Sequence, residues 1–180
     1  MKLIGLAGRM GSGKDTVAAM LAPHGYERFA FADGLRREVE AAMLEKYAPP
    51  GCLSDDAVEA FLYAPIAEIR SKPTTPRMRA LLQQWGTEYR RGQDPDYWTG
   101  IMRERLSTVG AAAISDVRFA NEAELVRELG GEVWLIERPG CQTNGHASEA
   151  LAFAVDRVID NSGDMEHLRN EVARALGEVK

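Results

Sequence analysis

Two hydrophobic patterns alternate along this chain: short continuous apolar runs, and longer segments in which apolar residues recur every three or four positions. The short runs predict buried strands, and they cover 3–7, 26–31, 111–115, 132–136 and 157–160. The longer segments predict helices, and they cover 14–21, 35–47, 77–91, 96–106, 121–129 and 165–176. Strands that alternate with helices imply a parallel sheet with helices on both faces, so the pattern predicts an α/β fold.

The segment from 48 to 76 breaks this alternation. It holds five prolines, several polar clusters and one weak helical stretch near 56–62. Long irregular segments within compact domains are often functional. We therefore expect an excursion from the main fold here, in the form of a mobile flap. Farther along, the sequence predicts a loop over 138–148 and a short helix over 149–153.

Composition and charge narrow the class of protein. With 180 residues, 45% of them hydrophobic, the chain is expected to form one compact domain. Its net charge of −5 argues against binding a nucleic-acid polymer through counterion release. Arginine makes up 17 of the 22 basic residues, which suits a small phosphorylated ligand because the guanidinium pairs with phosphate oxygens. Codon composition would explain the same excess.

Cysteine usage and hydropathy bear on the cellular compartment. Cys52 and Cys141 lie far apart and outside any CxxC or Cys/His array, so neither a zinc site nor a disulfide framework is expected. The apolar run over 3–7 is too short for a signal peptide or a membrane span. We therefore expect a cytoplasmic protein without a membrane partner.

The glycine-rich stretch 8–16 carries the main functional signal. Its sequence, Gly-Arg-Met-Gly-Ser-Gly-Lys-Asp-Thr, matches the P-loop pattern GxxxxGK and lies between a predicted strand and a predicted helix. Glycines let backbone N–H groups approach phosphate oxygens, and Lys14 would reach the β- and γ-phosphates of ATP. Because Asp15 occupies the usual hydroxyl position, Thr16 becomes the candidate ligand of Mg²⁺. The expected ATP-binding residues in this stretch are Gly11, Ser12, Gly13, Lys14, Asp15 and Thr16.

Other interpretations of this stretch fit less well. A glycine-rich turn with an exposed lysine would not require a strand before it and a helix after it. A dinucleotide-binding turn would follow GxGxxG, whereas Gly8, Gly11 and Gly13 follow GxxGxG. The sequence has no Asn-Lys-x-Asp element of the kind that GTPases use to read a base. A kinase with a flap that binds its substrate fits best.

A second acidic site is expected where another buried strand ends. Asp116 follows the apolar run 111–115, and it is the candidate that would hold Mg²⁺ together with Thr16. Arg118 would emerge from the same strand end, where ligands of open α/β sheets bind. Asp116 could instead cap a helix or turn, and Arg118 could form a surface ion pair.

Four stretches resemble the deoxynucleoside monophosphate kinases of phages and bacteria, a branch of the nucleoside monophosphate kinases. They are the P-loop 8–16, the sequence Phe-Ala-Phe-Ala-Asp-Gly-Leu-Arg at 29–36, the Trp-Gly-Thr-Glu to Asp-Pro-Asp-Tyr-Trp region within 82–98, and Ile-Ser-Asp-Val-Arg-Phe-Ala-Asn-Glu at 114–122. Gly34 and Ala120 depart from the resemblance, because proline is expected at both positions. Residues 48–76 match nothing in the family pattern.

The resemblance implies a three-layer P-loop fold over 1–180, with an acceptor-binding helical insertion near 48–108 and a short lid near 137–149. It also implies that the acceptor and its phosphate contact Asp33, Arg90, Arg91 and Arg118. Arg138 would belong to the lid and Asn161 would border the adenine. Adjacent arginines point in different directions on a helix, so Arg90 and Arg91 are not expected to serve the phosphate equally.

Aromatic and loop residues near these stretches are open to two interpretations. Trp85 and Trp98 would stack on the acceptor base if their rings were exposed, although aromatic residues in helices more often pack in the core. His146 could touch a ligand, although loop histidines are usually solvated, and Glu149 could simply begin a helix. Neither His146 nor Glu149 belongs to the main candidate set.

The sequence thus predicts a Mg²⁺- and ATP-dependent kinase of a deoxynucleoside or ribonucleoside monophosphate. Its catalytic set would be Lys14, Arg118, Asp116 and Asp33, and a phosphate acceptor would need no general base because it is already ionised at pH 7. Alternatives are a kinase of dephospho-coenzyme A, with Asp33 as base, a phosphomevalonate kinase, and a non-catalytic nucleotide-binding module. A homodimer is compatible with the sequence, which leaves open the base preference and the choice between deoxyribose and ribose.

Overall fold

The structure is a computed structural model that describes residues 1–48, 53–71, 74–141 and 152–178. The chain divides into two compact units, which we treat separately. Unit 1 comprises Met1–Phe31 and Arg103–Lys180, and unit 2 comprises Ala32–Met102. No helix in the described part of the chain combines the length and apolar composition that crossing a bilayer requires.

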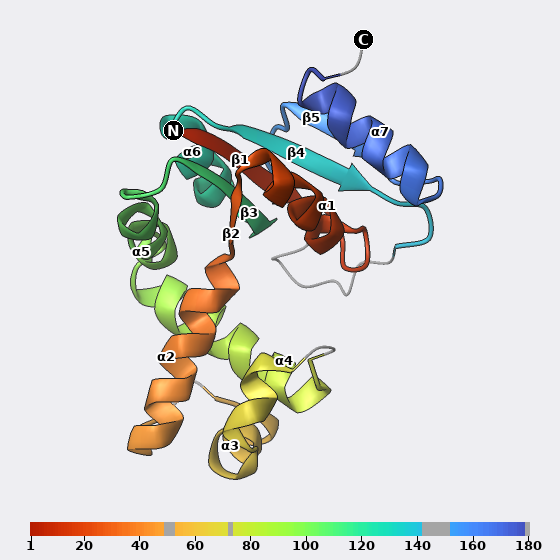
Figure 1. The fold of residues 1–180 in the computed structure, drawn as a ribbon. Helices are drawn as coiled ribbons and strands as arrows, with labels where there is room; N and C mark the ends of the chain where they lie inside the picture. Colours follow the sequence, from red (N-terminus) through yellow and green to blue (C-terminus); the bar gives the residue numbers. More distant parts are fainter. Residues whose placement is uncertain (49–52, 72–73, 142–151, 179–180) are drawn as a thin grey trace. The chain divides into compact units, whose positions relative to one another are not determined.

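Unit 1 contains a five-stranded sheet in which every neighbouring pair is parallel (Figure 1). Its strands are β1 (Lys2–Ala7), β2 (Glu27–Phe29), β3 (Ala111–Val117), β4 (Glu132–Glu137) and β5 (Arg157–Asp160). The order β2-β3-β1-β4-β5 places β1 at the centre, between β3 and β4. Because all strands run the same way, their carboxyl ends meet at one edge of the sheet, where open α/β sheets bind ligands.

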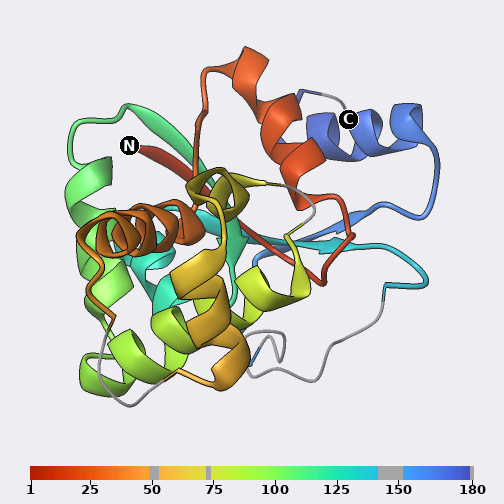
Figure 2. The same ribbon diagram turned by 90° about the horizontal axis from the view of Figure 1, so that it is seen from below.

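Helices cover both faces of this sheet (Figures 1 and 2). On one face, α1 (Lys14–Leu21) and α7 (Met165–Ala175) share a buried core with side chains of β1, β3, β4 and β5. On the other face, α6 (Ala120–Glu128) packs so close to β1 that a Cβ at Gly5 would lie 2.9 Å from Val126. The predicted three-layer α/β architecture is therefore confirmed.

Unit 2 is helical and has a hydrophobic core of its own, which includes Val39, Ile69, Met78 and Leu81. Its helices are α2 (Phe31–Glu45), α3 (Asp55–Tyr63), α4 (Pro76–Gln83) and α5 (Tyr97–Leu106), with α2 starting in the last residue of unit 1 and α5 ending in unit 1. Two shorter elements are a 3₁₀ helix (Ile66–Arg70) and a π-helix (Gln84–Arg91). A further 3₁₀ turn, Ala22–His24, follows α1 in unit 1.

Most predicted elements are present, and three differ in ways that have a physical cause. The strand predicted over 26–31 is shorter because the N–H of Phe31 donates to Asp116 Oδ1 (2.8 Å) and α2 begins there. The helix predicted over 77–91 divides into α4 and the π-helix. Of the helix predicted over 149–153, only Ala152 and Phe153 are described, and neither is helical.

Candidate functional site

The P-loop connects β1, the central strand, to α1 at the carboxyl edge of the sheet. Two of its glycines leave no room for a side chain. A Cβ at Gly8 would lie 2.6 Å from the carbonyl oxygen of Ile136, and one at Gly13 would lie 2.5 Å from Asn161 Nδ2. Both glycines also have positive φ angles, 143° and 102°, which other residues rarely adopt. The loop can therefore follow this path only with glycine at these positions.

Lys14 is the first residue of α1, and its ammonium group folds back over the loop. Its Nζ donates to the carbonyl oxygens of Gly8 (2.6 Å) and Arg9 (2.7 Å). Burial, together with the nearby Arg118 charge, lowers the pKa of Lys14 to about 8, and the Asp116 charge opposes this shift. An ammonium held by carbonyl dipoles in a partly dry site would be stabilised by an anion, so Lys14 is suited to a phosphate oxygen.

Ser12 provides an independent indication of an anionic ligand. Its side chain is 1% exposed, and Oγ has no hydrogen-bond partner in the described part of the chain. Buried hydroxyls are normally hydrogen-bonded, so an unpaired one next to a glycine-rich turn is consistent with a ligand site. Asn161 directly follows β5 and stabilises the loop, because its Nδ2 donates to the carbonyl oxygen of Ser12 (2.8 Å).

Asp116 and Arg118 lie where β3 ends, one strand away from the P-loop. β3 extends to Val117, so Asp116 lies inside the strand rather than after it, and Ala7 of β1 pairs with Val117. Arg118 is exposed, and its charge is close enough to affect the pKa of Lys14. Asp116 therefore lies on the strand that pairs with β1, and its role as the acidic site beside the P-loop stays a prediction.

Glu122 orients this strand end, although its role was not predicted. It is 2% exposed, and its Oε2 accepts from the backbone N–H groups of Arg118 (2.7 Å) and Phe119 (3.2 Å). Glu122 lies three residues after Phe119, the residue that precedes α6, which is the position of the glutamate in a capping box; Phe119 stands where that motif has Ser or Thr, so the sequence alone does not indicate the cap. The cap fixes the backbone from which the Arg118 side chain extends.

Thr16 and Asp116 are the side chains that could hold Mg²⁺. Among residues 1–48, 53–71, 74–141 and 152–178, no three His, Cys, Asp or Glu side chains gather into a metal site. Mg²⁺ bound to a nucleotide needs only one or two protein ligands, because phosphate oxygens and water complete its shell. Thr16 lies half-buried in the first turn of α1, and Asp15 beside it lies 3.5 Å from Arg28 of β2. A hydroxyl and a carboxylate are the ligand types that this ion prefers.

The residues expected to form a lid are described only in part. Arg138 directly follows β4 and is exposed. Arg9 Nη1 donates to the carbonyl oxygen of Cys141 (3.2 Å), which ties this segment to the P-loop. His146, Glu149 and the rest of the lid from 142 onwards lie outside the described residues.

The acceptor candidates of unit 2 occupy different environments. Asp33 lies in the first turn of α2. Arg90 and Arg91 end the π-helix and diverge: Arg90 Nε donates to Glu38 Oε1 (2.5 Å), whereas Arg91 Nη1 donates to the carbonyl oxygen of Pro95 (3.2 Å). Glu38 was not a candidate, since its partners are distant in the sequence.

Trp85 and Trp98 are packing residues of unit 2. They are 3% and 4% exposed, respectively. Trp85 stacks on Phe61 with ring centroids 6.0 Å apart and donates from Nε1 to Glu38 Oε1 (2.7 Å). Trp98 donates from Nε1 to the carbonyl oxygen of Gly86 (3.0 Å). Protein atoms surround both indoles, which favours packing in the core over stacking on the acceptor base.

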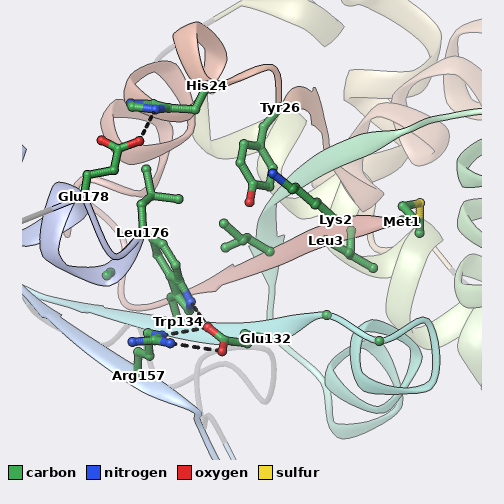
Figure 3. A pocket seen from close by; sticks show the side chains of 14 residues that line it. Met1, Lys2, Leu3, His24, Tyr26, Glu132, Trp134, Arg157, Leu176 and Glu178 are labelled. Carbon is green, nitrogen blue, oxygen red and sulfur yellow. Dashed lines mark hydrogen bonds and ion pairs between the residues drawn. The ribbon is translucent and has the colours of Figure 1, made fainter.

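A cavity of about 500 Å³ lies at the opposite, amino end of the strands (Figure 3). Four of its polar lining residues are paired with one another, Glu132 with Arg157 (2.7 Å) and His24 with Glu178 (2.8 Å). Ligands of parallel sheets bind at the carboxyl ends, and this cavity contains none of the P-loop residues. We therefore place the candidate site at the P-loop and not in the cavity.

Comparisons with known proteins identify the family of the chain. No protein-family model matches the chain. A protein of Acanthamoeba polyphaga mimivirus, named provisionally as a deoxynucleotide monophosphate kinase, is 30% identical over 201 aligned residues, which cover 96% of this chain and 94% of the viral protein.

Two solved structures resemble the chain along almost its whole length. Protein TT1252 from Thermus thermophilus is 19% identical, with a TM-score of 0.51, and the match covers 99% of this chain and 97% of that protein. A dephospho-CoA kinase from Campylobacter jejuni is 13% identical, with a TM-score of 0.48 and coverage of 98% and 97%. The likeness to the Thermus protein concerns the fold alone.

Proposed function

Because this chain belongs to the deoxynucleotide monophosphate kinase family, we propose that it transfers the γ-phosphoryl group of ATP to a deoxynucleoside monophosphate, giving ADP and the diphosphate. The observation that carries the proposal is the environment of the Lys14 ammonium group on the P-loop. Its ammonium is partly dehydrated, and among the described residues its hydrogen-bond partners are the carbonyl oxygens of Gly8 and Arg9. This arrangement suits a cation that exchanges carbonyl dipoles for phosphate oxygens when ATP binds.

Unit 1 supplies the binding of ATP in this proposal. Backbone N–H groups of residues 11–16 and the N-terminus of α1 would hold the β- and γ-phosphates, and Lys14 would neutralise the charge that spreads during transfer. Mg²⁺, when bound by Thr16 and Asp116, would supply further neutralisation of the phosphates. Asn161 keeps the loop in place through the Ser12 carbonyl, and Arg138 is available to the nucleotide as an exposed cation.

Arg118, Asp33 and the arginines of the π-helix are assigned to the acceptor. A phosphate monoester is mostly dianionic at pH 7, so positioning and charge neutralisation suffice and no general base is needed. Arg118 suits the transferring group because it is exposed and close enough to Lys14 to affect its pKa. Of the π-helix pair, Arg90 is half-buried and firmly held, which favours it over Arg91 as the ligand of the acceptor phosphate.

An ATP-dependent phosphorylation assay over a panel of acceptors tests this function. The panel should contain deoxynucleoside monophosphates, the matching ribonucleoside monophosphates and dephospho-coenzyme A. We expect turnover with at least one deoxynucleoside monophosphate and none with dephospho-coenzyme A. Turnover of dephospho-coenzyme A alone would contradict the substrate class while leaving the P-loop assignment intact.

Two variants, assayed with the preferred acceptor, distinguish phosphoryl transfer to a phosphate from phosphoryl transfer to a hydroxyl. Arg118→Ala should raise the acceptor KM and lower kcat by roughly ten-fold each, while the KM for ATP stays nearly constant, because a charge-assisted hydrogen bond to phosphate contributes about 1.5 to 3 kcal/mol. Asp33→Asn should retain measurable turnover, since a dianionic acceptor needs no base. Complete loss of activity in Asp33→Asn would indicate a hydroxyl acceptor.

A further inference from the structure

The carboxylate of Glu38 lies at the centre of a hydrogen-bonded cluster that joins α2, the π-helix and α5. Its Oε1 accepts from Trp85 Nε1 (2.7 Å) and Arg90 Nε (2.5 Å), and its Oε2 accepts from the Tyr97 hydroxyl (2.7 Å). The Glu38 side chain is only 20% exposed. Burial and the bond to Glu38 raise the pKa of Tyr97, so its hydroxyl stays a donor at neutral pH. Both oxygens of this carboxylate are therefore committed to the cluster.

The guanidinium of Arg90 is held on three of its sides. Glu38 binds its Nε edge, and its Cζ lies 4.9 Å from the ring centroid of Tyr89 and 4.7 Å from that of Tyr97. Within the part of the chain that the structure describes, Arg90 has no other hydrogen-bond partner. Its Nη edge is the side from which arginine forms paired hydrogen bonds to a phosphate. A guanidinium with its remaining sides fixed offers this edge in a single orientation.

The π-helix accounts for the convergence of Trp85 and Arg90 on one carboxylate. These residues are five positions apart, and in an α-helix such positions lie about 140° apart around the axis. The i→i+5 hydrogen bonds of a π-helix bring residues five apart onto the same side. Gly86 adds to this by allowing close packing, since a Cβ there would lie 2.9 Å from Leu35 Cδ2 on α2. The winding and the glycine together place both donors within reach of Glu38.

We propose that Glu38 is a positioning residue for the kinase reaction: it orients Arg90 so that the Nη edge meets the phosphate of the acceptor. The inference rests on the proposed function, in which Arg90 binds that phosphate. Glu38 itself would not bind the acceptor phosphate, because a carboxylate and a phosphate dianion repel each other. Its negative charge also balances Arg90 in the absence of acceptor, so that this half-buried cation is not left unpaired.

Steady-state kinetics of Glu38→Gln with the preferred deoxynucleoside monophosphate test this proposal. We expect the acceptor KM to rise about ten-fold, the KM for ATP to stay within about two-fold and kcat to fall by less than about three-fold, the pattern of weakened binding. Glu40→Gln is the matched control. Glu40 lies two residues further along α2 and forms a similar pair with Arg70 (2.5 Å), which has no role in the proposed site. This control should leave all three constants within about two-fold of wild type.

A double-mutant cycle shows whether Glu38 acts through Arg90. Arg90→Ala should raise the acceptor KM about 100-fold, and adding Glu38→Gln should change it by less than about two-fold, because the residue that Glu38 orients is gone. If the increases in acceptor KM of the two single variants multiply in the double variant, the inference is wrong. It is also wrong if Glu38→Gln leaves the acceptor KM unchanged while Arg90→Ala raises it. If Arg90→Ala itself leaves the acceptor KM unchanged, the assignment of Arg90 in the proposed function fails instead.

A milder variant keeps the test decisive if Glu38→Gln does not fold. Tyr97→Phe removes one hydrogen bond to Glu38 and retains the ring that flanks Arg90. We expect the acceptor KM to rise about three-fold, with an unchanged KM for ATP, and this rise should disappear in the Arg90→Ala background. An acceptor KM equal to that of wild type would contradict the positioning role.

Discussion

The two units hold the cations proposed to bind phosphate, Lys14 and Arg90, in different ways. In unit 1, Lys14 is bonded to two backbone carbonyl oxygens, and burial brings its pKa down to about 8. In unit 2, Arg90 is bonded to the full charge of Glu38 and flanked by two tyrosine rings. Dipoles compensate a charge less completely than a carboxylate does. In the proposed function, Lys14 would therefore exchange its carbonyl partners for phosphate oxygens, whereas Arg90 would keep Glu38 and bind the acceptor phosphate with its other edge.

This difference matches the work proposed for each unit. A cation that stabilises a transferring phosphoryl group must interact most strongly in the transition state. A cation that binds the acceptor must hold one orientation before transfer begins. The weak compensation of Lys14 by carbonyl dipoles suits the first requirement, and the fixed orientation of Arg90 by Glu38 suits the second.

Removing the ammonium of Lys14 should have the largest effect, and it tests the role proposed for this residue in unit 1. Lys14→Ala should lower kcat by roughly three orders of magnitude or more, because a positive charge at the transferring phosphoryl group contributes about 3 to 4 kcal/mol. The fold should persist, since the partners of Nζ among the described residues are two carbonyl oxygens of the loop itself. The measurement is kcat of a variant shown to be folded by circular dichroism. Turnover close to that of wild type would refute the P-loop assignment.

Asp116→Asn should have the next largest effect. It removes one proposed Mg²⁺ ligand, so activity at saturating Mg²⁺ should fall by about 100-fold, while ATP binding without metal should be nearly unchanged. Asn retains the side-chain oxygen that accepts from the N–H of Phe31, so the start of α2 should be preserved. Titration of activity with Mg²⁺ and calorimetry without it separate the two effects. Unchanged activity would leave Asp116 with a structural role only.

The chain's sequence predicts unit 1 much better than the details of unit 2, for physical reasons. The predicted helix 14–21 and strand 157–160 agree with α1 and β5 at both ends, because glycines, charges and apolar runs mark these boundaries locally. The π-helix could not be predicted in this way, since apolar spacing over 77–91 fits an ordinary helix equally well. Its winding depends on contacts with α2, such as that of Leu35 with Gly86.

The site residues show the same division between local and long-range signals. The P-loop is a contiguous motif whose chemistry can be inferred from its own residues. Glu38 is separated from Trp85 and Arg90 by 47 and 52 positions, so nothing near it in the sequence indicates its partners. The start of α2 was misplaced for a similar reason, because Asp116, 85 residues away, accepts the N–H of Phe31. Burial of the two tryptophans likewise depends on the whole of unit 2.

The lowered pKa of Lys14 predicts that ATP binding takes up a proton in alkaline solution. In the unfolded chain this pKa stays near 10.5, and burial in the folded, ligand-free protein lowers it to about 8. Between these values the unfolded state binds more protons, so stability without ligand should rise with pH in this window. Phosphate contacts would raise the pKa again, and ATP affinity should therefore fall by up to about ten-fold per pH unit above 8.

Calorimetry at pH 9 in buffers with different ionisation heats measures this uptake. We expect close to one proton per ATP, since free Lys14 would be mostly neutral and bound Lys14 mostly charged. Lys14→Arg is the matched control, because a guanidinium remains charged throughout this range. If the control takes up as many protons as the wild type, a group other than Lys14 titrates. The lowered pKa of Lys14, on which the comparison with Arg90 depends, would then be wrong.

The smallest expected effect concerns the separate cores of the two units. Asp164 caps α7 in unit 1 by accepting from the N–H of His167 (2.9 Å), and Thr75 caps α4 in unit 2 by accepting from the N–H of Met78 (3.4 Å). Asp164→Ala and Thr75→Ala should each cost about 1 kcal/mol of helix stability.

Trp134 lies in the core of unit 1, whereas Trp85 and Trp98 lie in unit 2, so Trp134→Phe leaves a fluorescence signal from unit 2 alone. In urea unfolding of that background, Thr75→Ala should lower the midpoint, because it removes a cap and a hydrogen bond to Glu68 in the unit that is observed, whereas Asp164→Ala should leave the midpoint nearly unchanged. A midpoint clearly lowered by Asp164→Ala would show that the two units unfold as one cooperative structure.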